Sequence, residues 1–99
     1  MPAAAPAVPP AEQKRQDAQR RQQLANQLKP LRKELEQVDK RMAALNAEKA
    51  ALENRLTQAL APAEIAESGK RLKAVSDELD ELEMRWLELS EAIEGAQAG

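Results

Sequence analysis

The sequence predicts an all-α protein: a two-helix antiparallel coiled-coil hairpin preceded by a disordered, Pro/Ala-rich N-terminal linker. Three observations support this prediction. Charged residues make up 32% of the 99 residues, and Leu and Ala supply most of the apolar ones, as in long amphipathic helices. Apolar residues recur in alternating steps of three and four along two stretches. A single Pro-containing break separates those stretches, because Pro is tolerated in the first turn of a helix but not in its interior.

The chain begins with two segments that have little to bury. Residues 1–11 contain four Pro and five Ala, which predicts a flexible linker and suggests that the chain is the tail of a larger protein. Residues 12–29 are basic and rich in Gln, with only Leu24 and Leu28 to bury, so we expect a frayed or kinked helix there. Pro30 then begins the first helix of the hairpin. A longer helix that is kinked at Pro30 is the alternative.

The hairpin is expected over residues 30–95, with a helix at 30–60, a turn at 60–64, a second helix at 62–94 and a flexible tail at 96–99. The second helix either continues through Ser68 and Gly69 or restarts there with Ser68 as its cap. Because two helices bury a limited apolar area, we expect a monomeric hairpin of small stability or weak self-association.

A single register aligns the two helices. Leu45 faces Leu79 and Leu31 faces Ile93, so facing residue numbers add up to 124. The remaining layers are Leu28/Ala96, Leu35/Leu89, Val38/Trp86, Met42/Leu82, Lys49/Val75, Leu52/Leu72, Leu56/Ser68 and Ala59/Ile65. Charge favours the same pairing, because residues 30–60 carry six cations and five anions, and residues 62–94 carry four cations and ten anions.

The composition argues against an enzyme. The chain has no His and no Cys, so it lacks an imidazole base, a thiolate and soft metal ligands, and its three Gly cannot form a phosphate-binding loop. The carboxylates between Asp77 and Glu83 lack the Gly-containing loop of a calcium site. The sequence therefore predicts no catalytic, cofactor-binding or metal-binding residue. The first residues lack the features of a signal peptide, and no run approaches the ~20 apolar residues of a membrane span.

Two residues on the seam allow more than one interpretation. Trp86 is interpreted as a core residue, because Leu79 and Ile93 at seven-residue spacing are core residues too, and stacking on a nucleic-acid base is the alternative. Lys49 is expected to pack its stem against Val75 while its ammonium reaches solvent, and specifying the register is the other possible role.

The segments Lys29-Pro30-Leu31-Arg32-Lys33-Glu34 and Glu83-Met84-Arg85-Trp86-Leu87-Glu88 resemble the C-terminal coiled-coil domain of ABC-F ATP-binding-cassette ATPases. The resemblance covers residues 21–94, and the Uup/YheS branch is the most similar. It implies a cytoplasmic parent protein that acts on the ribosome and translation, or on DNA. ATP and Mg would bind to cassettes of that parent outside this chain, since no P-loop, signature sequence or acidic metal-binding motif is present here.

The resemblance and the charge pattern together indicate a nucleic-acid-contacting accessory domain, with ribosomal RNA or DNA as the partner. Residues 12–29 carry five cations and two anions, and those before Leu28 lie beyond the predicted end of the second helix. The candidate phosphate contacts are Lys14, Arg15, Arg20, Arg21, Lys29, Arg32 and Lys33. The alternative is a purely structural or oligomerisation coiled coil that binds no nucleic acid.

Overall fold

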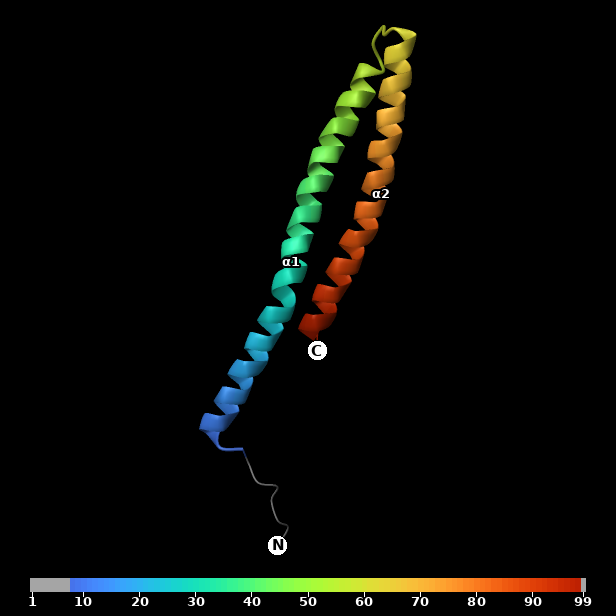
Figure 1. The fold of residues 1–99 in the computed structure, drawn as a ribbon. Coiled ribbons are helices and arrows are strands. Elements are labelled where there is room, and N and C mark those ends of the chain that lie inside the picture. Colours follow the sequence, from blue (N-terminus) through green and yellow to red (C-terminus); the bar gives the residue numbers. More distant parts are fainter. Residues whose placement is uncertain (1–7, 99) are drawn as a thin grey trace.

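Two long helices form an extended antiparallel hairpin, which confirms the predicted fold class (Figure 1). The computed structural model describes residues 8–98. Helix α1 spans Pro10–Arg55 and helix α2 spans Pro62–Ala98. The predicted linker at residues 1–7 lies outside the described residues, whereas Pro10 and Ala11, placed in that linker by the sequence, are the first residues of α1. Pro10 suits this position, because the first residue of a helix needs no backbone N–H donor.

The first helix of the hairpin was predicted to begin at Pro30, but α1 begins at Pro10. It runs through Pro30 as one helix of 46 residues, which is the alternative that the sequence left open. Pro30 removes one backbone hydrogen bond, at a cost of about 3 kcal/mol. Packing on both sides of Pro30 offsets that cost, because Leu28 is 3% exposed and Leu31 is half-buried.

The turn between the helices is longer than predicted. Helix α1 ends at Arg55 rather than at residue 60, because Thr57 donates two hydrogen bonds to the carbonyl oxygen of Asn54, from its backbone N–H at 3.1 Å and its hydroxyl at 2.6 Å. Helix α2 begins at Pro62, where the carbonyl oxygen of Ala61 accepts the first bonds. Since α1 has already ended, the outermost predicted layer, Ala59 against Ile65, does not form, and Ile65 is 49% exposed.

Helix α2 is continuous through Ser68 and Gly69 and extends to Ala98, past the predicted end at residue 94. The predicted flexible tail is therefore helical at residues 96–98. The predicted register accounts for this longer helix, because it places Ala96 opposite the buried Leu28 and so gives the last turn of α2 something to pack against.

The core is the predicted seam. Its buried apolar residues are Leu28, Val38, Leu45, Val75, Leu79 and Leu89, and Ser68 is the buried polar residue. Leu45, Val75 and Leu79 form the central cluster, and Met42, Leu52 and Leu82 pack against it. Trp86 departs from the core interpretation, because it is 39% exposed although its layer partner Val38 is buried. Lys49 is half-buried in the layer of Val75.

Candidate nucleic-acid interface

Helix α1 is longer than α2, and its N-terminal part projects past the C-terminal end of α2 (Figure 1). In the register of the hairpin, Ala98 at the end of α2 lies opposite Asn26. Residues 10–25, here called the extension, therefore have no α2 residue beside them and span about 24 Å of helix. Local side-chain interactions hold this part, such as the hydrogen bond from Gln22 Nε2 to Asn26 Oδ1 at 3.1 Å.

All seven predicted contact residues are exposed, and the helix places six of them on one face of α1. Successive residues are about 100° apart around an α-helix, and these six fall within an arc of about 120°. The face runs for about 28 Å along α1, at 1.5 Å per residue. It is called the basic stripe and consists of Lys14, Arg15, Arg21, Lys29, Arg32 and Lys33.

Arg20, the seventh predicted residue, lies on the opposite side of α1. Its Nη1 is 3.9 Å from Asp17 Oδ1, one turn earlier in the helix. The structure thus separates two neighbouring arginines, since Arg21 belongs to the basic stripe and Arg20 faces away from it and has a carboxylate partner.

The cations of the basic stripe differ from most other cations of the molecule in having no ion-pair partner within residues 8–98. The stripe ends where carboxylates appear on the same face of α1. Glu36 lies 3.1 Å from the ammonium of Lys40, and Asp39 follows Val38 on the edge of the seam. Between Lys14 and Lys33 the sequence has one carboxylate, Asp17, which lies at the edge of the stripe and pairs with Arg20.

The four arginines on one edge of the seam are all paired with glutamates of the other helix. Arg41 Nη2 donates to Glu78 Oε1 at 2.9 Å, and Arg71 Nη2 donates to Glu48 Oε1 at 2.7 Å. The complete set, here called the ion-pair ladder, is Glu34 with Arg85, Arg41 with Glu78, Glu48 with Arg71, and Arg55 with Glu64. These residues recur every seven positions along one edge of the hairpin, and each pair's numbers add up to 119.

The ladder was missed in the sequence, although a signal for it exists. The seam residues come in pairs three positions apart, such as Leu35 and Val38, and each ladder residue directly precedes the first member of such a pair. Along both helices the charge at these preceding positions alternates between negative and positive. This alternation opposes slippage. A shift of seven residues would place Arg41 opposite Arg71 or Arg85, and Glu48 opposite Glu64 or Glu78, so like charges would face each other.

The ion pairs also perturb the titration of the ladder residues. Hydrogen bonds from the facing arginines lower the pKa of Glu34, Glu48 and Glu78 below the ordinary value of about 4.5. The same bonds raise the pKa of Arg41, Arg71 and Arg85. Glu34, Glu48 and Glu78 are therefore ionised at neutral pH and hold Arg85, Arg71 and Arg41, which leaves these arginines less available to an external phosphate.

Residues 27–91 match the family of ABC transporter C-terminal domains, which is found in ABC-F proteins. This chain belongs to that family. No curated protein sequence and no solved structure matches it. The matched region contains the whole ladder and the stripe residues Lys29, Arg32 and Lys33, whereas Lys14, Arg15 and Arg21 precede it.

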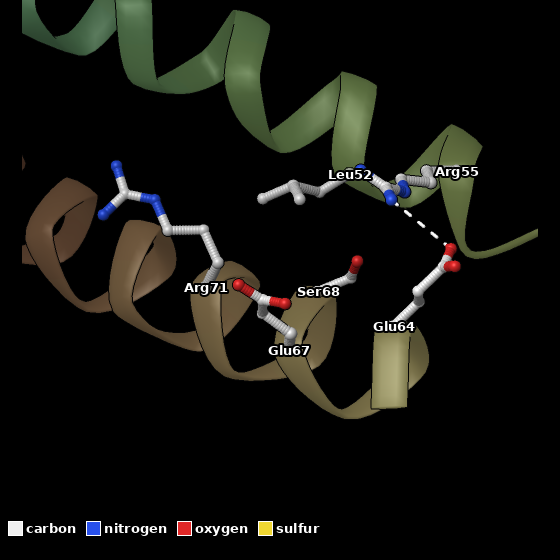
Figure 2. Close-up of a pocket in the computed structure, with 6 residues that line it drawn as sticks. All are labelled: Leu52, Arg55, Glu64, Glu67, Ser68 and Arg71. Carbon is white, nitrogen blue, oxygen red and sulfur yellow. Dashed lines mark hydrogen bonds and ion pairs between the residues drawn. The ribbon is translucent and has the colours of Figure 1, made fainter. Parts of the chain in front are cut away.

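Besides the stripe, this C-terminal domain has a small polar pocket of about 210 Å³ near the turn (Figure 2). It lies between Leu52 of α1 and Ser68 of α2, because a serine fills less of the seam than a leucine would. Its two arginines, Arg55 and Arg71, are already paired with Glu64 and Glu48. We therefore interpret the pocket as a packing defect of the seam rather than as a ligand site.

The described part of the domain contains no group of three or more residues that could hold a metal ion. None of its helices is long and apolar enough to cross a membrane, as judged over the same residues. Besides the basic stripe, the described surface carries exposed apolar residues of α2, among them Trp86 and Leu87.

Proposed function

We propose that this chain is the non-catalytic accessory domain of an ABC-F ATPase and that it contacts nucleic acid, either ribosomal RNA or DNA, through the basic stripe. One observation carries the proposal. Six cations share a face of α1 and form no ion pair within residues 8–98, while the four arginines of the ion-pair ladder each face a glutamate. Cations that are not neutralised by carboxylates remain available to phosphates.

The chemistry of the stripe favours contact with the backbone of a nucleic acid over direct recognition of sequence. Lys and Arg on an exposed helix face bind phosphates, and phosphate contacts position a protein without reading bases. The acidic surface of α2, with ten anions against four cations over residues 62–94, repels a polyanion. The nucleic acid therefore lies along the extension and the first turns of the hairpin.

We further propose, from the resemblance, that the parent protein is cytoplasmic and belongs to the Uup/YheS branch. The cassettes of that parent would bind ATP and Mg outside this chain, and its target would be the translating ribosome or DNA. Family membership supports the ABC-F context. The branch, the cytoplasmic location and the target are part of the proposal.

The test compares two matched triple variants. The first replaces Lys14, Arg21 and Lys29 of the stripe with Gln, and the second replaces Arg20, Lys70 and Lys73 with Gln. Both remove one Arg and two Lys, and Gln is a comparable helix former. Fluorescence anisotropy with a labelled DNA duplex of about 20 bp and with an RNA hairpin measures affinity over a range of salt concentrations.

We expect the stripe variant to bind both probes more weakly. On duplex DNA, its plot of log affinity against log salt should be shallower by up to about 0.9 for each phosphate that the variant no longer binds. The control variant should bind as the wild type does. Equally weakened binding in both variants would mean that bulk charge rather than a site binds the probe. Binding by neither variant nor the wild type would favour the structural or oligomerisation coiled coil.

A further inference from the structure

Trp86 is the only aromatic residue of the chain, and it is not buried as a seam residue should be. It belongs to the layer of Val38, which is 6% exposed, yet Trp86 is 39% exposed. A leucine at this position would fill the seam without placing an aromatic ring at the surface. Part of the indole therefore packs in the coiled coil while another part is open to solvent.

The two residues near it on α2 are also apolar and exposed. Met84 is 66% exposed and Leu87 is 53% exposed, and residues three apart are neighbours on a helix surface. Leu87 follows Trp86 directly, whereas Met84 lies about 160° from Trp86 around α2, on the outer side of the helix. Trp86 and Leu87 are together called the apolar cluster, on a helix that is otherwise rich in carboxylates. In the heptad register, Leu87 lies on the side of α2 that is away from Arg85 and the ion-pair ladder.

The cluster lies close to the end of the basic stripe. Trp86 is in the layer of Val38, five residues after Lys33, which corresponds to about 8 Å along α1. The same register places Arg32 on the edge of α1 that is away from the ladder. Arg32 is therefore the stripe cation on the same edge of the hairpin as the apolar cluster.

The charges around Trp86 determine which part of a nucleic acid can reach it. Asp39 of α1 and Glu83 of α2 are exposed and flank the Trp86 layer on the open edge. These carboxylates repel phosphates, but they can accept hydrogen bonds from the amino groups of bases. An indole stacks on bases of any sequence. The arrangement suits a base that is turned towards Trp86 while its backbone stays on the stripe.

We propose that the preferred ligand is a nucleic acid with unpaired bases next to the strand that the stripe holds, such as a single strand or a duplex with an overhang. The proposal rests on the proposed function, because the stripe supplies the backbone contacts. In a blunt duplex the bases are stacked inside the helix, so that Trp86 has no free base to contact. The apolar cluster thus adds selectivity for unpaired bases to an otherwise unselective phosphate site.

The single tryptophan provides a direct readout. Three DNA probes of equal charge are compared, a single strand, a blunt duplex and a duplex with an unpaired 3′ overhang, each at saturation as judged from anisotropy. We expect the single strand and the overhang to quench Trp86 fluorescence and the blunt duplex to bind without quenching. Trp86→Leu keeps an apolar residue on the seam and should reduce the affinity for the first two probes about fivefold to a hundredfold. Its affinity for the blunt duplex should not change.

Trp86→Phe is the rescue variant, since phenylalanine retains a stacking face, and it should keep most of the preference for unpaired bases. Circular dichroism checks that both variants are folded. Equal quenching by all three probes, or an unchanged preference in Trp86→Leu, would overturn this inference and leave the proposed function intact. The stripe variant tests that function separately, since its weaker binding extends to the blunt duplex. A blue shift of Trp86 fluorescence on raising the protein concentration alone, with dimers in sedimentation, would instead assign the cluster to a contact between two copies.

Discussion

The hairpin and the extension share helix α1 but use their cations differently. In the hairpin, Arg41 and Arg55 are paired with glutamates of α2, and Arg71 and Arg85 are paired with glutamates of α1. In the extension, Lys14, Arg15 and Arg21 form no ion pair with any described residue. For the extension the difference follows from helix length, because α2 ends at Ala98 and supplies no carboxylates beyond it. Lys29, Arg32 and Lys33 lie beside α2, but on the side of α1 that is turned away from the ion-pair ladder.

This comparison separates structural charge from binding charge. Opposite charges at matched positions of two helices specify how the helices align, whereas cations that extend past the partner helix keep their charge for another molecule. The two regions also differ in what holds them together. The hairpin is held by its apolar seam, and the extension is held by its own backbone and local side-chain pairs.

The largest expected difference concerns two leucines of α1. Leu45 is 1% exposed at the centre of the seam, and Leu24 is half-buried in the extension with no facing residue in the register. Leu45→Ala should lower the free energy of unfolding by about 2–5 kcal/mol, because it leaves a cavity in the core. Leu24→Ala should lower it by less than about 1 kcal/mol. Urea unfolding followed by circular dichroism measures both, and equal decreases would show that the extension packs as part of the hairpin.

Much of the fold could be predicted from the sequence. The fold class follows from periodicity and composition, and every buried residue lies at a position that the predicted register places on the seam. The helix ends were wrong because they depend on local details. The prediction assumed that Pro30 starts a new helix, whereas packing of Leu28 and Leu31 lets α1 continue through it. At the other end, the hydrogen bonds from Thr57 to Asn54 end α1 earlier than predicted.

The candidate site was only partly predictable. Six of the seven cations named from charge share one face, and helical spacing alone would have separated Arg20 from them. The ion-pair ladder follows from the register once flanking positions are compared. The exposure of Trp86 could not be predicted in the same way, because its spacing is that of a core residue and the depth of an indole in the seam depends on the actual packing.

A smaller effect is expected from reversing one charge of the ladder. Arg41→Glu should lower the midpoint of thermal unfolding, because the new carboxylate at position 41 would face the carboxylate of Glu78. Adding Glu78→Arg should restore most of the stability, since the pair is opposite in charge again. Arg21→Glu in the extension makes the same change and should leave the midpoint almost unchanged. A double variant no more stable than Arg41→Glu alone would show that the pair does not stabilise the hairpin.

The smallest expected effect is a pH dependence confined to the hairpin. The pKa of Glu34, Glu48 and Glu78 is lowered in the folded chain, so these carboxylates release protons more readily folded than unfolded. Their contribution is therefore fully present above the ordinary pKa of about 4.5 and is lost as the pH falls through the lowered values. A variant with all three glutamates replaced by Gln should be less stable than the wild type at pH 7.

That difference in stability should shrink as the pH is lowered from about 5 to 3. Protonation then removes from the wild type the negative charges that the substitutions have already removed from the variant. Thermal unfolding followed by circular dichroism at each pH gives the comparison, and the other carboxylates cancel because both proteins carry them. A control variant with Gln at positions 53, 81 and 91 replaces three exposed glutamates that have no ion-pair partner within the described residues. Two results would mean that the ladder aligns the helices without stabilising them. Either the difference in stability between the wild type and the ladder variant stays constant down to pH 3, or the control variant shows an equal pH-dependent difference.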